Sequence, residues 1–300
     1  MKLIVYPDVD IWEFVLSGLK SRSDVLLFPL NQHSNIFQKV SRKYGSTIPL
    51  PIHFVVGSSL HKAIRKLIPG DAIIIAEYTD PALIMAISRI VPEDVSRYLW
   101  LWNHKGNNKG FTNNLSAIKK NDFQVITYDE LDAEKYGFRW HTQFFNIKPY
   151  QKVDSIQDNT FLYDFLFVGY AKNRVAEIEN IHSMLSSYNC KFVTVHTSSD
   201  YIPYTKYMEM AIHSRCLVEI VHSGDPSCTL RPLEAMAIRR KLLTNNPAIH
   251  NYSFFHSQNI FIIGENDLSK LPEFLYSPIE PLPSEVVDSY DVNNWIESFQ

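Results

Sequence analysis

The sequence has few cysteines, no excess of basic residues and no long apolar run, and each absence excludes a class of protein. Cys190, Cys216 and Cys228 show neither CxxC spacing nor a matching histidine pair, which argues against a disulfide framework or structural zinc. The net charge of −3 gives no basic field for nucleic acid. No run approaches the ~18 apolar residues of a membrane span, and Asp8 and Asp10 precede any signal-length apolar region. We therefore expect a cytoplasmic protein that binds no nucleic acid.

Short apolar runs recur along the chain, and segments with helical periodicity separate them. We predict parallel strands over residues 2–6, 24–28, 71–76, 98–102, 123–127, 163–168, 191–195, 216–221, 241–244 and 259–263. The main helical segments are residues 11–19, 59–68, 81–90, 175–187, 204–214 and 292–299. Residues 136–159 break the alternation and are interpreted as a connection. The pattern predicts two α/β domains, residues 1–150 and 151–300, each with a parallel sheet.

In such sheets, ligands bind beyond the carboxyl ends of the strands. The loop after residue 168 reads Gly169-Tyr-Ala-Lys172-Asn-Arg174. A glycine there lets backbone N–H groups approach a ligand, and two cations at a helix start complement a diphosphate. The alternative is a plain turn with solvated cations.

The loop after the strand at residues 216–221 repeats this construction. Ser227 and Thr229 are residue types that cap helices, and Thr229 and Arg231 could donate hydrogen bonds to anionic oxygens. Glu234, one turn further on, could bind hydroxyls of a ribose or sugar. The alternative is a capped helix with Arg231 and Glu234 as a surface pair. Two loops of this kind in one domain favour a phosphate site.

Residues 230–237 (LRPLEAMA) and 241–246 (KLLTNN) resemble the C-terminal donor-binding segment of GT-B glycosyltransferases from bacterial lipopolysaccharide, capsule and exopolysaccharide clusters. Residues 164–169, 128–138 and 290–295 are similar to that group as well. The resemblance implies two Rossmann-like α/β domains facing a central cleft (GT-B type). The N-terminal domain would bind the acceptor and the C-terminal domain a nucleotide sugar, usually without a bound metal. The last helix would pack back on the N-terminal domain.

Glu234 resembles the second acid of the family's paired-glutamate motif, which binds the donor ribose. The residue eight positions earlier is Pro226 rather than glutamate, and the nearest acids are Asp225 and Glu219. Glu219 is therefore a candidate for the donor site. His222, at a strand end, could also contact the donor, or it could be a structural histidine.

Glycosyl transfer needs cations or helix N-termini at the departing phosphate. The resemblance and the loops together assign this role to Lys172, Arg174, Thr229 and Arg231. Asp8-Val9-Asp10 spells DxD, a metal signature of another glycosyltransferase fold, but it follows the first strand here. We expect no metal.

An inverting enzyme would need a general base on the acceptor domain, and a retaining enzyme would not. The candidates follow predicted strands: Asp8, Asp10, Glu77 and His104. Each could instead be a cap or turn residue, so the base and the stereochemistry stay open.

The sequence thus predicts a glycosyltransferase that uses a UDP- or GDP-type nucleotide sugar as co-substrate. Its acceptor would be a surface-polysaccharide glycan, with a lipid-linked glycan and contact with the inner face of the membrane left open. One alternative keeps the fold but uses a CMP-activated acidic sugar, such as a sialic acid or Kdo. Another, which Pro226 favours, is a non-catalytic nucleotide- or glycan-binding protein.

Overall fold

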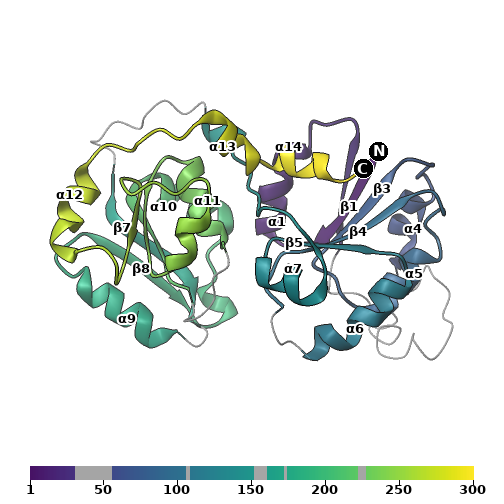
Figure 1. Cartoon of the computed structure of the whole chain (residues 1–300), viewed down its shortest axis with the longest axis horizontal. Helices are drawn as coiled ribbons and strands as arrows, with labels where there is room; N and C mark the ends of the chain where they lie inside the picture. Colours follow the sequence, from purple (N-terminus) through teal and green to yellow (C-terminus); the bar gives the residue numbers. More distant parts are fainter. Residues whose placement is uncertain (31–55, 106–108, 152–160, 172–173, 222–227) are drawn as a thin grey trace. The chain divides into compact units, whose positions relative to one another are not determined.

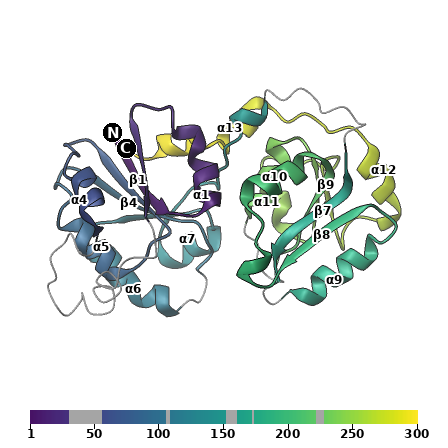
Figure 2. The ribbon, with the colours of Figure 1, turned by 180° about the vertical axis from the view of Figure 1, so that it is seen from behind.

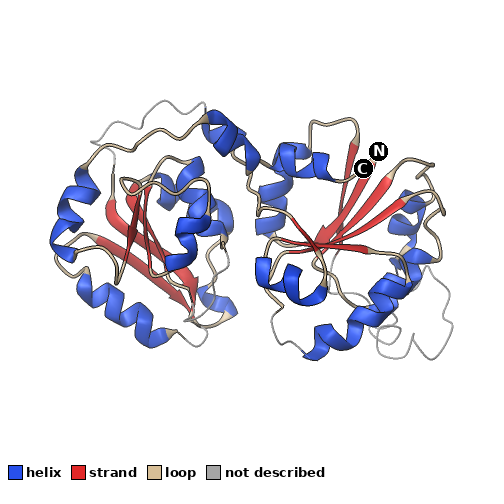
Figure 3. Cartoon of the chain, viewed as in Figure 1, coloured by secondary structure: helices blue, strands red, loops and turns tan. Residues whose placement is uncertain are grey.

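The computed structural model describes residues 1–30, 56–105, 109–151, 161–171, 174–221 and 228–300. The chain divides into two compact units. Unit 1 contains Met1–Thr142 and Trp295–Gln300, and unit 2 contains Gln143–Asn294. Each unit is an α/β structure with its own sheet (Figure 3). None of the described helices combines the length and the apolar character needed to cross a membrane.

Unit 1 has a six-stranded parallel sheet with the order β2-β1-β3-β4-β5-β6. The strands are β1 (Lys2–Pro7), β2 (Val25–Leu30), β3 (Ala72–Ala76), β4 (Ser96–Leu101), β5 (Gln124–Thr127) and β6 (Arg139–Trp140). The order reverses between β1 and β3. The carboxyl ends of these two neighbours therefore form the topological switch point, where open α/β sheets bind ligands.

Helices cover both faces of this sheet (Figure 1). They are α1 (Asp10–Val15), η1 (Leu16–Leu19), α4 (Ser58–Ile64), α5 (Pro81–Ser88), α6 (Lys109–Lys120) and α7 (Glu130–Tyr136). Alternate strand residues such as Leu3 and Val5 form one core cluster with residues of α4, α5 and α6, as the two-residue period of a strand requires.

The other face of the unit 1 sheet is aromatic. Trp295, the last residue of α14 (Val292–Trp295), and the following η6 (Ile296–Ser298) belong to this unit. The rings of Trp100 and Trp295 have centroids 5.5 Å apart, and those of Tyr98 and Phe299 5.2 Å. The Tyr98 hydroxyl donates to the carbonyl of Gln300 at 2.6 Å. These contacts make the chain's final residues part of unit 1.

Unit 2 has a five-stranded parallel sheet with the order β11-β10-β9-β7-β8. The strands are β7 (Tyr163–Tyr170), β8 (Cys190–Val195), β9 (Ser214–Glu219), β10 (Lys241–Thr244) and β11 (Ile260–Ile262). Here the switch point lies between β7 and β9. The two predicted phosphate loops follow these two strands.

Helices again lie on both faces of the unit 2 sheet, among them α9 (Val175–Met184), α10 (Tyr204–Ile212), α11 (Leu230–Ala237) and α12 (Leu271–Tyr276) (Figure 2). The other helical segments of the unit are α8 (Lys148–Gln151), η3 (Ser198–Asp200), η4 (Pro247–Asn251), η5 (Leu268–Lys270) and α13 (Ser284–Ser289). Residues of α9 and α12 join Phe165, Phe167 and Val218 in one core cluster. Helices α10 and α11 contact β9.

The segments at which unit 2 begins and ends are hydrogen-bonded to each other. Phe145 N donates to Tyr290 O at 2.9 Å, and Val292 N donates to Phe145 O at 2.8 Å. The Asp291 carboxylate accepts from Ile147 N at 3.0 Å. The chain therefore enters and leaves unit 2 at one place.

The predicted α/β class with two parallel sheets is confirmed, and each of the ten predicted strands is present within a few residues of its expected bounds. Strand β6 and helices α6, α7, α8, α12 and α13 were not predicted. Apart from α6, these elements are short, so they give little of the apolar periodicity on which the prediction depended.

Candidate functional site

Gly169 lies near the carboxyl end of β7, and its missing side chain is needed locally. A Cβ at Gly169 would stand 3.0 Å from Cζ of Phe167 and 3.2 Å from a guanidinium nitrogen of Arg174. The first distance is at the limit of what real Cβ atoms show, so a larger residue would displace one of these side chains. The glycine therefore admits the Arg174 side chain to the switch point.

Arg174 precedes α9 and folds back over the end of β7. Its guanidinium donates to Tyr170 O at 3.3 Å and also to Ile220 O. Burial and, next, the nearby charge of Arg231 lower the pKa of Arg174. An arginine stays protonated despite such a shift. Two cations share this edge of the unit 2 sheet, because Arg174 donates to Tyr170 O and Arg231 donates to Val168 O.

Arg231 lies in the first turn of α11, whose N-cap is Thr229 as predicted. The Thr229 side chain accepts from Arg231 N at 3.2 Å. The Arg231 guanidinium donates to Val168 O at 2.7 Å and to Glu234 Oε2 at 2.9 Å, and it lies 4.4 Å from the centre of the Tyr207 ring. These contacts tie the start of α11 to the end of β7.

Glu234 is buried, with 3% of its surface exposed. Tyr204, Tyr207 and Arg231 all donate to its carboxylate. Burial outweighs the nearby guanidinium and raises the pKa of Glu234. The alternative of a surface pair with Arg231 is therefore wrong about the surface, because the pair lies inside the unit. The ribose-binding role stays a prediction, and a ribose would have to share the carboxylate with two tyrosines.

Glu219 ends β9 and is also buried. Its two carboxylate oxygens accept from Thr229 and from Thr244, each at 2.6 Å. Burial raises the pKa of Glu219. The residue thus joins β9 to β10 and to the cap of α11, and its predicted contact with a donor stays a prediction. Lys172, His222 and Ser227 lie outside the described residues.

Two of the predicted acid–base residues of unit 1 follow β1. Asp8 is exposed, and its backbone N–H donates to Leu30 O at 3.3 Å. Asp10 is the first residue of α1, where a carboxylate complements the helix dipole. Both lie beside the unit 1 switch point.

Glu77 follows β3 and has an unusual backbone, with a φ of +63°. Its carboxylate accepts from Trp102 N at 2.6 Å and from Asn103 N at 3.2 Å, and it forms an ion pair with Lys105. Three donors from the loop after β4 therefore occupy Glu77. Its geometry is that of a residue that holds this loop.

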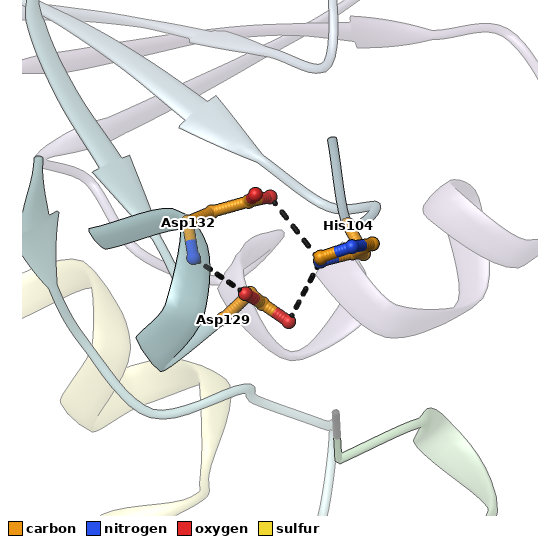
Figure 4. Close-up of side chains that lie close together, drawn as sticks. All are labelled: His104, Asp129 and Asp132. Atoms are coloured by element: carbon orange, nitrogen blue, oxygen red, sulfur yellow. Dashed lines mark hydrogen bonds and ion pairs between the residues drawn. The ribbon is translucent and has the colours of Figure 1, made fainter. Parts of the chain in front are cut away.

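His104 stands on the loop that Glu77 holds. Its Nδ1 lies 3.0 Å from Oδ2 of Asp129 and 3.5 Å from Oδ2 of Asp132 (Figure 4). The side chain of His104 is 35% exposed, whereas those of the two aspartates are 1% exposed. Among the described residues, this is the group of side chains that could together ligate a metal.

Asp129 and Asp132 were not among the predicted site residues. Asp129 caps α7 and accepts from Asp132 N at 2.7 Å. The available signal was an aspartate two residues after the strand that ends at Thr127, followed three residues later by a second aspartate. Tyr204 and Tyr207 were also missed, because nothing local links helix α10 to Glu234.

Comparison with known proteins supports the fold. No protein-family model matches the sequence, and the search of curated proteins finds no match. An alpha-glucosyltransferase in complex with UDP and a 13-mer DNA superposes with a TM-score of 0.59, at 9% identity over 92% of this chain and 89% of that one.

Two further solved structures are similar over nearly their whole length. A UDP-forming alpha,alpha-trehalose-phosphate synthase from Burkholderia xenovorans gives a TM-score of 0.54, at 10% identity over 99% of this chain and 97% of that one. The E. coli trehalose-6-phosphate structure bound with UDP-2-fluoro glucose gives 0.55, at 11% identity over 99% and 98%. The likeness establishes the fold class: two Rossmann-like domains of the GT-B type.

Proposed function

We propose that this chain is a glycosyltransferase that moves a sugar from a nucleotide-sugar donor to a glycan acceptor. The donor nucleotide would bind unit 2, at the carboxyl ends of β7 and β9. The acceptor would bind unit 1, and it would belong to a surface polysaccharide of the lipopolysaccharide, capsule or exopolysaccharide kind. Transfer would need no metal ion, and the protein would work in the cytoplasm, at or near the inner face of the membrane.

The observation that carries this proposal is the pair of arginines at the unit 2 switch point. Arg174 precedes α9 and Arg231 lies in the first turn of α11. Arg174 is held by the carbonyls of Tyr170, at the end of β7, and Ile220, just after β9. Arg231 is held by the carbonyl of Val168 in β7. The N-terminus of α11 lies in the same place, and Arg231 is part of its first turn. Two fixed cations and a helix N-terminus complement the charge of a departing diphosphate.

A UDP-type donor is favoured over the other nucleotides. The alpha-glucosyltransferase and the E. coli structure carry UDP or a UDP-sugar analogue. The acceptor class rests on the sequence resemblance of residues 230–246.

Calorimetric titration with UDP, GDP, CMP, ADP and dTDP, with and without magnesium, tests the donor site. We expect UDP to bind most tightly and magnesium to leave its Kd unchanged. Arg174→Ala and Arg231→Lys should each raise the Kd for UDP about ten- to hundredfold, because a charge-assisted hydrogen bond contributes about 1.5–3 kcal/mol.

Arg215→Ala is the matched control. Arg215 lies at the opposite, amino end of β9, where it pairs with Asp164. Its replacement should leave the Kd for UDP unchanged. If Arg174→Ala and Arg231→Lys both bind UDP with unaltered affinity and keep the circular dichroism spectrum of the wild type, the proposed donor site is wrong. No binding of any nucleotide by the wild type would contradict the function itself, and tightest binding of CMP would favour an acidic-sugar donor.

A further inference from the structure

The carboxylate of Glu234 receives three hydrogen bonds from inside unit 2. The Tyr204 hydroxyl donates to Oε1, the Tyr207 hydroxyl donates to Oε2 at 2.5 Å, and the Arg231 guanidinium donates to Oε2 at 2.9 Å. The two oxygens of a carboxylate together offer about four lone pairs. Three of these positions are therefore taken by groups of the protein itself.

The same carboxylate is almost inaccessible to a ligand. The Glu234 side chain is 4% exposed, and Tyr204 and Tyr207 are buried as well. The two tyrosines are three residues apart on α10, so they lie on one face of that helix, and both reach Glu234. A ribose hydroxyl could reach the carboxylate only if a tyrosine moved away. A buried tyrosine hydroxyl that lost its acceptor in this way would oppose binding.

Glu219, the other candidate acid of the donor site, is enclosed in the same way. Its Oε1 accepts from the Thr229 hydroxyl and its Oε2 from the Thr244 hydroxyl, each at 2.6 Å. The residue is buried, and its two partners cap α11 and end β10. Both candidate acids therefore have their oxygens paired before any donor binds.

The group that Glu234 orients is the guanidinium of Arg231. Its Nη1 donates to Glu234, its Nη2 donates to Val168 O at 2.7 Å, and its central carbon lies 4.4 Å from the centre of the Tyr207 ring. A guanidinium carries five N–H groups in a rigid planar fork. Bonds to two of its nitrogens therefore fix the plane and the direction of the others. Glu234 thus determines where the remaining N–H groups of Arg231 point.

We propose that Glu234 is a positioning residue for Arg231 and does not bind the ribose of the donor, so that the donor site accepts 2′-deoxyribonucleotides and ribonucleotides alike. This role rests on the donor site proposed above, and it widens the class of nucleotide that the site takes. It replaces the ribose-binding role that the sequence resemblance implies for Glu234. All of the contacts on which it depends lie within unit 2.

Discrimination between ribose and deoxyribose requires a protein group that loses its partner when the hydroxyl is missing. A site built to hydrogen-bond a substrate hydroxyl rejects the analogue without it, because the polar groups of the site are then left unpaired. The oxygens of Glu219 and Glu234 keep their threonine, tyrosine and arginine partners whether or not the ribose carries a 2′-hydroxyl. Removal of that hydroxyl should therefore change the affinity little.

Calorimetry on the wild-type chain tests the nucleotide class without any mutation. The two ligands are UDP and 2′-deoxy-UDP. We expect their Kd values to agree within about fivefold, whereas a hydrogen bond from the 2′-hydroxyl to a carboxylate would make the deoxy form about ten- to hundredfold weaker. A loss of more than about fivefold for 2′-deoxy-UDP would overturn the proposal.

Glu234→Gln tests the positioning role, because it keeps the size of the side chain and removes the charge that holds Arg231. It should raise the Kd of UDP and that of 2′-deoxy-UDP by the same factor, about tenfold. In an Arg231→Lys background, the same change should have almost no further effect, since the guanidinium that Glu234 orients is absent. Glu273→Gln is the matched control: Glu273 is exposed in the first turn of α12, and both Kd values should stay unchanged.

A ribose-binding Glu234 would behave differently. Glu234→Gln would then weaken UDP and spare 2′-deoxy-UDP, and its effect would add to that of Arg231→Lys. Either result would overturn the positioning role. If Glu234→Gln does not fold, Tyr207→Phe takes its place, because it withdraws one donor from Glu234 and keeps the ring beside Arg231. The ratio of the two Kd values should then equal that of the wild type, and a changed ratio would contradict the proposal.

Failure of this role can be told apart from failure of the proposed function. A wild type that binds UDP and rejects 2′-deoxy-UDP would overturn the role of Glu234 and leave the donor site intact. A wild type that binds no nucleotide would overturn the proposed function, and the role of Glu234 with it.

Discussion

The carboxyl edges of the two sheets hold their acidic side chains in opposite ways. In unit 2, Glu219 and Glu234 are each 3% exposed and are held by hydroxyl groups and a guanidinium. In unit 1, Asp8 is exposed, and the buried pair Asp129 and Asp132 faces a half-exposed histidine. One edge thus uses its acids to build a rigid support for cations. The other uses them to orient a ring that reaches solvent.

This difference predicts that mutations at the two edges have different main effects. Removing an acid of the unit 2 edge should loosen the support on which Arg231 rests. Removing an acid of the unit 1 edge should change the behaviour of His104 more than the stability of the fold. All five tryptophans of the sequence lie in unit 1, so their fluorescence follows unit 1, while circular dichroism follows both units.

The largest effect is expected at Glu234. Glu234→Ala should lower the free energy of unfolding of unit 2 by about 3–5 kcal/mol, because it removes the carboxylate that pairs with Arg231 and accepts from Tyr204 and Tyr207 inside the unit. Asp8→Ala, at the other edge, should stay within about 0.5 kcal/mol of the wild type. Urea unfolding followed by circular dichroism and by tryptophan fluorescence measures both. Equal losses in the two variants would remove the distinction between the edges.

A smaller effect is expected from a matched pair of threonines. Thr244 ends β10 and Thr127 ends β5, and each accepts from the backbone N–H two residues on, at 3.0 and 3.2 Å. In addition, Thr244 donates to buried Glu219. Thr244→Val should therefore lower the free energy of unfolding by about 1–3 kcal/mol more than the loss of the backbone bond from Asn246 N alone.

Thr127→Val provides the reference for that measurement, because the Thr127 hydroxyl accepts the matching backbone bond and, among the described residues, donates to no carboxylate. The difference between the two losses of unfolding free energy isolates the hydroxyl–carboxylate bond. A loss at Thr127 equal to that at Thr244 would show that Glu219 gains nothing from the hydroxyl.

The smallest expected effect is on the pH dependence of stability. Between pH 7 and pH 5, the free energies of unfolding of the two units should change in opposite directions. Burial raises the pKa of Glu219 and Glu234 above the ordinary value of 4.5. Their contribution to the free energy of unfolding is therefore fully present below pH 4.5 and is lost as the pH rises through their folded-state pKa. Burial lowers the pKa of His141, in unit 1, below 6.5. As the pH falls below 6.5, the unfolded chain binds a proton at this residue before the folded chain does, so the stability of unit 1 decreases. Acidification should stabilise unit 2 and destabilise unit 1.

Glu219→Gln and His141→Phe sharpen this test. The first variant should flatten the pH dependence of the dichroism transition, and the second that of the fluorescence transition. Parallel pH slopes for the two probes in the wild type would show that the units do not differ in this respect.

Much of the fold could be predicted from local sequence, with exceptions among the helices. Strand β10 has the predicted bounds of residues 241–244, because a short buried parallel strand is a continuous apolar run that polar residues limit. Helix α6 (KGFTNNLSAIKK) was missed although Phe111, Leu115 and Ile118 follow the helical period and face the core. Helix α7 is mostly polar, although Asp129 caps it and Gly137 ends it with a φ of +68°.

The site was less predictable, since its residues come from distant elements. Thr229 could be recognised as a cap because capping is local. The partners of Glu234 come from α10, about 30 residues earlier, and no local pattern indicates that contact. His104 was one of four equal candidates, and only the sheet order, which places β4 beside β5, brings Asp129 and Asp132 to it.

The return of the chain to unit 1 has a consequence for biosynthesis. Trp295 and Phe299 are fully buried against Trp100 and Tyr98, and the ribosome adds them after every residue of unit 2. Domains generally fold as units while they are being made. Unit 2 therefore has all of its residues before unit 1 does, although unit 1 starts first. The aromatic layer of unit 1 is therefore completed only after the residues of unit 2 have been synthesised.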